Sequence, residues 1–302
     1  MKKYTVYQID SFTKEMFRGN PAGVVVNADG LSERQMQQLA RELNNSETAF
    51  LLAPDGPDCD GVIRYFTPQT EVPTCGHATV AAMYAKALEE GVDGAVWRMR
   101  TKIGVLPFAV ARTGEDSDYK VTMTQGRIEL AEPLAADVRQ KLLDRLGLSE
   151  ADLDRRCPVQ IASTGHSKVL IGINSRDRLN GLAPDLAGLA ELSGVIGCNG
   201  YFVFSFDSGS PGVLTCGRMF APAIGIAEDP VTGNANGPLG AYLVHHGLVD
   251  NSGSEFRFLG RQGEAMNRPG LIEVIVKIAE RQPVLVQVAG EAVVVFRTEI
   301  AI

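Results

Sequence analysis

The sequence lacks several features that would assign it to a particular class of protein. It has no stretch of eighteen apolar residues, so no segment is predicted to cross a membrane as a helix. Its five cysteines are an odd number without close spacing, which argues against a disulfide framework and favours reduced thiols in the cytoplasm. Net positive charge is also missing. The formal charge of -7 disfavours nucleic acid or an anionic membrane as a partner.

Motifs that hold cofactors and metals are absent as well. The chain has no glycine-rich dinucleotide or phosphate loop, and the segment 19–23 (GNPAG) has the wrong residues for either. No spacing of His, Cys and Asp indicates a metal site. We therefore expect neither a cofactor nor a metal. The opening residues 1–10 read as a first β-strand rather than a signal peptide.

What is present is a globular chain built around one repeated stretch. With 302 residues, 45% of them hydrophobic, the chain is long enough for two domains. The stretch Arg64–Ala78 contains a cysteine, a glycine and a histidine at the start of a predicted helix. A second copy, 218–235, repeats its Arg, Phe, Pro, Gly and Ala in order. This repeat predicts a duplicated fold with a site between the halves.

The predicted elements recur in the same order in both halves. We place the first half at 1–127 and the second at 128–289, with a C-terminal strand near 290–302 packing onto the first half. Two helices, near 77–88 and 234–244, are apolar on nearly every face and are therefore predicted to be buried all round. A curved sheet of its own should enclose each of them. The remaining predictions are helices at 33–43, 137–146 and 185–193, and strands at 4–10, 49–53, 62–66, 96–101, 106–111, 119–124, 159–163, 201–205, 271–278, 284–288 and 292–297.

Four motifs together resemble the PhzF family of phenazine-biosynthesis-like isomerases. They are FRGNPAG at 17–23, SETAF at 46–50, CGHAT at 75–79 and EDPVTGN at 228–234. The resemblance covers essentially the whole chain. It implies an α+β fold of the diaminopimelate-epimerase type, with two similar halves that each wrap a curved, mostly antiparallel, barrel-like sheet around a central helix. It also implies a cofactor-independent isomerase and a homodimer.

Three residues are the predicted catalytic groups. The resemblance gives Glu47 the task of moving a proton between two carbons of the substrate. A carboxylate held at a helix-to-strand corner can act as a base and then as an acid. His77 is similar to the family's second catalytic group, which protonates or polarises the substrate, and Asp229 is the expected partner that orients it. All three are expected to line one cleft between the halves.

The substrate is expected to be a small molecule that carries a carboxylate. Backbone N–H groups at Gly76–His77 and at Gly233–Asn234 should lie at two helix starts, where unpaired N–H groups and the helix dipole bind anions. Cys75 could act as a base there, because a helix N-terminus lowers the pKa of a thiol, or it could simply line the pocket. Thr232 is expected to position the substrate.

Two other functions fit the same residues. One is an epimerase, a racemase or a dehydratase of the hydroxyproline type, which would use Cys75 and Thr232. The other is a protein without turnover that binds a small molecule or another protein. The presence of Glu47, His77 and Asp229 together favours an enzyme over the second alternative.

Overall fold

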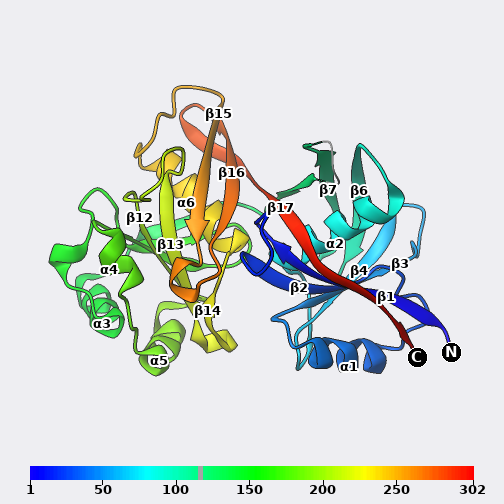
Figure 1. The fold of residues 1–302 in the computed structure, drawn as a ribbon. Coiled ribbons are helices and arrows are strands. Elements are labelled where there is room, and N and C mark those ends of the chain that lie inside the picture. Colours follow the sequence, from blue (N-terminus) through cyan, green and yellow to red (C-terminus); the bar gives the residue numbers. More distant parts are fainter. Residues whose placement is uncertain (115–117) are drawn as a thin grey trace. The chain divides into compact units, whose positions relative to one another are not determined.

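The computed structural model describes residues 1–114 and 118–302, and the chain forms two compact units (Figure 1). The first unit contains Met1–Met123 and Ala289–Ile302, and the second contains Thr124–Val288. The division that we placed after residue 127 falls in the segment between strand β8, which ends at Thr124, and strand β9.

The elements of the structure include most of those that the sequence predicts and several that it does not. In the first unit these are β1 (Lys3–Ser11), β2 (Asn20–Val25), α1 (Glu33–Leu43), β3 (Thr48–Leu52), β4 (Gly61–Phe66), β5 (Glu71–Val72), α2 (Gly76–Glu90), β6 (Gly94–Thr101), β7 (Gly104–Arg112) and β8 (Tyr119–Thr124). In the second they are β9 (Glu129–Pro133), α3 (Ala136–Leu146), β10 (Gln160–Ser163), β11 (Lys168–Ile173), α4 (Arg176–Asn180), α5 (Leu186–Ile196), β12 (Tyr201–Ser205), β13 (Thr215–Ala221), β14 (Ile226–Asp229), α6 (Gly233–His245), β15 (Glu255–Gln262) and β16 (Gly270–Ala279). The last strand, β17 (Gln282–Ala301), belongs to both units.

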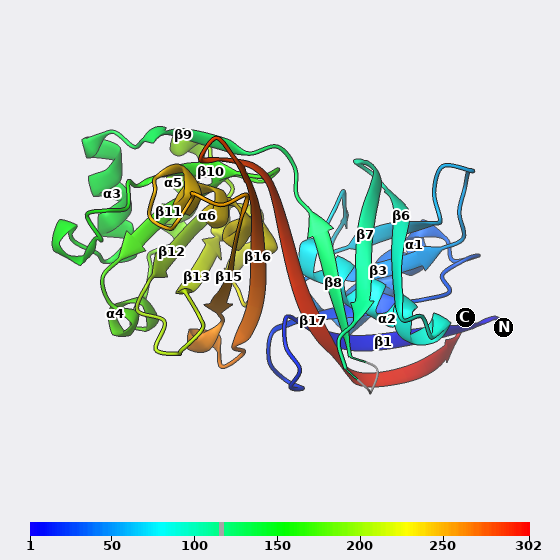
Figure 2. The same ribbon diagram turned by 90° about the horizontal axis from the view of Figure 1, so that it is seen from above.

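Eight strands of the first unit pair in a closed circuit. The order is β1, β2, β3, β4, β6, β7, β8 and β17, which returns to β1. The pairs β2–β3 and β4–β6 are parallel, so the barrel is mixed rather than uniformly antiparallel. Helix α2 packs against β1, β2, β3 and β7 (Figure 2). Its residues from His77 to Ala85 are all buried, as a helix that is apolar all round should be.

The second unit repeats this strand order around α6. The sequence of pairings is β9, β10, β11, β12, β13, β15, β16 and β17, with parallel pairs at β11–β12 and β13–β15. Helix α6 packs on β10, β11 and β16. The ring of Phe204 meets the ring of Tyr242 edge-on, which identifies the face of β12 that looks toward α6.

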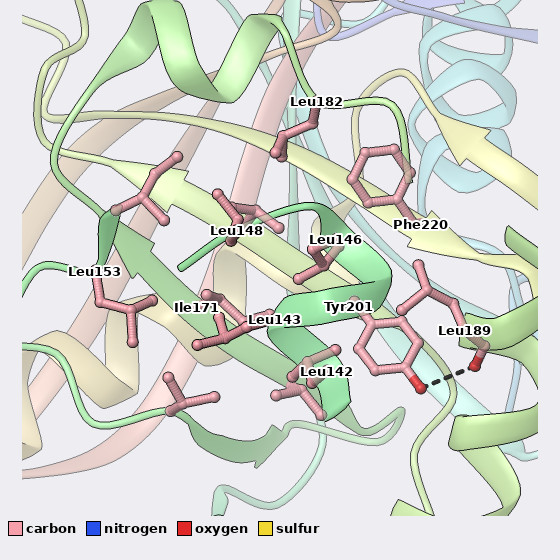
Figure 3. Close-up of a cluster of buried hydrophobic side chains, with 14 of the residues drawn as sticks. Leu142, Leu143, Leu146, Leu148, Leu153, Ile171, Leu182, Leu189, Tyr201 and Phe220 are labelled. Atoms are coloured by element: carbon pink, nitrogen blue, oxygen red, sulfur yellow. Dashed lines mark hydrogen bonds between the residues drawn. The ribbon is translucent and has the colours of Figure 1, made fainter. Parts of the chain in front are cut away.

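Helices α3 and α5 cover the opposite face of the second sheet. A cluster of buried side chains joins them to β11, β12 and β13, and Tyr201 donates a hydrogen bond from its hydroxyl to the carbonyl of Leu189 at 2.9 Å (Figure 3). Val169, Ile171 and Val203 belong to this outer cluster. Because neighbouring residues of a strand face opposite sides, Lys168 and Leu170 therefore point inward, toward α6.

Strand β17 corrects two expectations. We predicted separate strands at 284–288 and 292–297, but one strand runs through Ala289 and Gly290 without a break. We also predicted a separate sheet around each central helix. The pairings instead form one connected set of seventeen strands, because β17 continues from the second unit into the first. The closed circuit around α2 lies within that set.

The arginine of the repeated stretch has a structural role in both units. Arg64 forms two hydrogen bonds of 2.7 Å with Glu71, and Arg218 forms two of 2.8 Å with Glu228. Each pair braces the turn that leads from the strand to the central helix. No helix among the described residues is both long and apolar enough to cross a membrane.

Candidate active site

Glu47 lies at the corner between α1 and β3 in the first unit. Ser32 caps the start of α1 in a capping box with Gln35, and Asn44 ends the helix in the left-handed conformation. The chain then turns into β3, which runs parallel to β2. The side chain of Glu47 is 13% exposed, so its carboxylate is largely shielded from solvent.

His77 is the second residue of α2 and lies beside that carboxylate. Its Nε2 is 3.4 Å from Glu47 Oε2 and 3.2 Å from the hydroxyl of Ser46. Its Nδ1 is 3.4 Å from the sulfur of Cys75. The Ser11 hydroxyl donates a 2.8 Å hydrogen bond to the His77 carbonyl, which ties the start of α2 to the end of β1.

The imidazole therefore stands between a carboxylate and a thiol. Ligand atoms of Glu47, Cys75 and His77 all lie within 4.8 Å of one another, a grouping that could suggest a metal. The carboxylate contacts one ring nitrogen and the thiol contacts the other. An imidazole with these two contacts can also accept a proton at one nitrogen and donate one from the other.

The start of α2 leaves backbone donors available. Cys75 is the N-cap residue, and its side chain forms no capping hydrogen bond. Its carbonyl instead accepts a 2.6 Å hydrogen bond from the Thr79 hydroxyl. The N–H groups of Gly76 and His77 belong to the first turn, where a helix has no internal acceptors for them. This end of α2 can therefore receive an anion.

Asp229 and Thr232 form a second polar group, at the start of α6. The Thr232 hydroxyl donates a short hydrogen bond to Asp229 Oδ2, so it does not cap the helix. The amide of Gln262 holds both residues, because its Nε2 donates to the Asp229 carbonyl at 2.7 Å and its Oε1 accepts from the Thr232 N–H at 3.1 Å. Asn236 donates to the same Oε1 at 3.0 Å. All four residues are buried.

Gly233 and Asn234 complete this helix start. The side-chain amide of Gln125 donates to the Gly233 carbonyl at 3.0 Å and to Asn234 Oδ1 at 3.4 Å. The Thr164 hydroxyl in turn donates to Gln125 Oε1 at 2.6 Å. The end of β10 and the start of α6 are thereby held together.

The predicted site residues thus fall into two groups within their own units. Glu47 and Cys75 both contact His77 in the first, whereas Asp229 and Thr232 are in contact in the second. The orientation of His77 by Asp229 and the shared cleft remain predictions, since they concern both units. Sequence reasoning missed Gln262 and Gln125. No local pattern marks Gln262, because it ends a strand, β15, that also contains Glu255, Arg257 and Arg261.

Known proteins similar to this chain share most of its length. The family model for phenazine biosynthesis-like proteins, PhzC-PhzF, matches residues 9–298. An uncharacterized isomerase of Clostridium acetobutylicum is 52% identical over 302 residues, which cover 100% of this chain and 99% of the relative. A trans-2,3-dihydro-3-hydroxyanthranilate isomerase of Pseudomonas chlororaphis is 34% identical over 94% of this chain and 95% of its own length.

A crystal structure supports the same grouping. The PhzF-family phenazine biosynthesis protein of Bacillus anthracis superposes with a TM-score of 0.88 at 31% identity, and the match covers 100% of both chains. The similarity therefore extends over both units of the fold.

Proposed function

Because the chain belongs to the PhzF family and is an isomerase of that family, we propose that it moves a proton between two carbons of a small carboxylate-bearing substrate without a cofactor. The observation that carries this proposal is the contact of His77 Nε2 with the shielded carboxylate of Glu47 at 3.4 Å. A carboxylate in this position can accept a proton from the substrate and later return a proton to it.

In the proposed reaction Glu47 removes a proton from one carbon of the substrate. The electron pair of the broken C–H bond shifts the double bond along the substrate. The carboxylic acid of Glu47, which is 13% exposed and can exchange its proton with solvent, then delivers a proton to a second carbon. Atoms and charge therefore balance without an added reductant or oxidant. His77 donates a hydrogen bond to the substrate where negative charge develops. Asp229 is proposed to orient His77.

The substrate carboxylate is proposed to bind at the helix starts. The N–H groups at Gly76–His77 and Gly233–Asn234 are the candidate donors, because neither N-cap side chain occupies them. Thr232 would position the substrate beside them. Binding would then use backbone groups, whereas proton transfer would use side chains.

The direct test is a search for proton exchange. Purified protein is incubated in D₂O with small unsaturated carboxylates, beginning with trans-2,3-dihydro-3-hydroxyanthranilate, the substrate in the name of the Pseudomonas relative. Mass spectrometry and NMR then follow the appearance of an isomer and of deuterium on carbon. Deuterium on a carbon with no change in connectivity would instead indicate epimerisation.

A second candidate function is supported by the position of the thiol. Cys75 Sγ lies 3.4 Å from His77 Nδ1 at the start of α2, where a thiolate would be stabilised by the imidazole and the helix dipole. Cys75 and Thr232 could then act as the acid–base pair of an epimerase or of a hydroxyproline-type dehydratase. A racemised or dehydrated product in the same screen would favour this function.

Removal of metals is expected to leave turnover intact. The proposed chemistry uses the carboxylate of Glu47 and backbone N–H groups, none of which needs an ion. The test compares initial rates before and after dialysis against a chelator, with buffer-dialysed protein as the control. Loss of the rate on chelation, followed by recovery with one added metal, would contradict the proposal and would return attention to the group of Glu47, Cys75 and His77.

Two further proposals follow from the family. We propose that the protein forms a homodimer, which light scattering would test, and that it acts in the cytoplasm. The five free cysteines, all of them buried, are consistent with a reducing compartment.

A further inference from the structure

Lys168 is a buried lysine that the proposed reaction does not use. It is the first residue of β11, it is 3% exposed, and its side chain lies on the inner face of the second sheet. Lysine is rarely buried to this extent unless it is paired. Among the residues that the structure describes, its ammonium group has one hydrogen bond, of 3.3 Å, to the carbonyl of neighbouring Ser167.

The second sheet is shaped to admit this side chain. Val169 pairs with Tyr201 in parallel register, so Lys168 lies beside Gly200. A Cβ atom at Gly200 would lie 3.3 Å from Cδ of Lys168 and 2.7 Å from the carbonyl oxygen of Phe220. Gly200 also has a φ of 159°, at the limit of what other residues adopt. Because Gly200 has no side chain, the space beside it is open to the side chain of Lys168, which extends toward the inner face of the sheet.

The first unit has different residues at the positions equivalent to Lys168 and its neighbour Gly200. Gly23 pairs with Thr48 in the first unit as Val169 pairs with Tyr201 in the second, each at the start of a parallel pair of strands. One residue earlier along both strands, the first unit has Ala22 and Glu47, whereas the second has Lys168 and Gly200. At this level of the sheet the second unit therefore has the amine of Lys168, whereas the first unit has the carboxylate of Glu47.

Other charged groups share this inner region. The negative charge of Asp229 favours the ammonium form of Lys168, and burial together with the charge of Lys168 lowers the pKa of His166. Asp229 pairs with Met219, whose strand neighbour Phe202 faces α6, so the carboxylate looks toward the same side. Burial dominates, and it lowers the pKa of Lys168 to about 8. The amine of Lys168 therefore lies in an environment that disfavours its charged form.

We propose that Lys168 is a substrate-binding residue whose ammonium group receives a carboxylate of the substrate beside the start of α6. The three donors of an ammonium group exceed the one acceptor described for it, and a bound carboxylate would supply the missing acceptors and the opposite charge. The inference rests on the proposed function, since that function names a carboxylate-bearing substrate. It adds that the second unit recognises the charge, so that an uncharged amide analogue is rejected.

The test uses benzoate as the probe and benzamide as its uncharged counterpart. Lys168→Met keeps the length of the side chain without the charge. Lys277→Met removes a lysine of the same unit that is 48% exposed and pairs with Glu255, so it serves as the matched control. Calorimetry should show that Lys168→Met weakens benzoate binding about 10- to 100-fold, as expected for a hydrogen bond to a charged group. Lys277→Met should leave the affinity for benzoate unchanged. No variant should bind benzamide more tightly than benzoate.

NMR with ¹³Cε-labelled lysine gives a second readout that a structural role would not move. The resonance of Lys168, assigned by its loss in Lys168→Met, should titrate at a higher pH when benzoate is bound, because an anion favours the charged amine. Equal benzoate affinity in wild type and Lys168→Met, an unshifted Lys168 titration, or no benzoate binding would each overturn the proposal. Neither readout needs turnover, so failure of the isomerase proposal would appear separately, as absence of proton exchange.

Discussion

Replacement of Glu47 by glutamine is expected to lower the rate of proton transfer by at least about 10²- to 10⁴-fold, the usual contribution of a general acid–base group. The amide retains the shape of the side chain and can still form hydrogen bonds, but it has no basicity near neutral pH. Ligand binding should largely survive, because the N–H groups at Gly76–His77 and Gly233–Asn234 are not altered. The measurements are turnover and deuterium incorporation with the substrate found by the exchange screen.

Cys75→Ser is the matched comparison, since Cys75 contacts the other nitrogen of the same imidazole. If Glu47 is the proton carrier, the serine variant should retain much more of the exchange rate than Glu47→Gln. The opposite pattern, with exchange at the wild-type rate in Glu47→Gln and none in Cys75→Ser, would identify the thiol as the base. The protein would then belong with the epimerase or dehydratase alternative.

The second large effect concerns stability, at Arg218. This side chain is 8% exposed and donates to the carbonyls of Leu179, Asn180 and Leu182 as well as to Glu228. Arg218→Met should lower the free energy of unfolding by about 3–5 kcal/mol, because it leaves a largely shielded carboxylate and three carbonyls, two of them in buried contacts, without their donor. Urea unfolding followed by circular dichroism measures this loss.

Arg64→Met, the equivalent change in the first unit, provides the control. Arg64 is more exposed than Arg218, at 24%, and Lys102 lies 2.6 Å from Glu71 and can still neutralise it. We therefore expect a smaller loss, of about 1–2 kcal/mol. Equal losses for the two variants would show that the backbone contacts of Arg218 contribute little.

The central helices were predictable because their signal is local. Residues 78–88 are apolar on nearly every face, and α2 and α6 begin and end within two residues of their predicted bounds. The capping box of Ser32 and Gln35, at the start of the helix predicted at 33–43, is likewise a local pattern. Strand β17 was not, since Ala289 and Gly290 suggest a break, whereas the strand continues through both residues into the segment 292–301 that pairs with the distant β1. Strands β9, β11 and β15 were also missed.

The candidate site was predictable only in part, for a related reason. The residues of one motif, such as Cys75 and His77, are neighbours in sequence, and their contact could be expected. The contact of Glu47 with His77 depends on the pairing of β3 with β2, and no local sequence pattern predicts it. Lys168 and Gln262 were overlooked because their role arises from the face of the strand on which they lie.

The course of β17 also determines the order in which the chain can fold during synthesis. Residues 124–288 are contiguous, so the second unit has all its strands available as soon as Val288 has left the ribosome. The first unit is synthesised earlier, yet its barrel needs residues 289–301 to join β8 to β1. Until then these two strands have exposed edges, which can pair with other chains. The half that emerges first is therefore the last to close, and its two edges stay open until residues 289–301 have emerged.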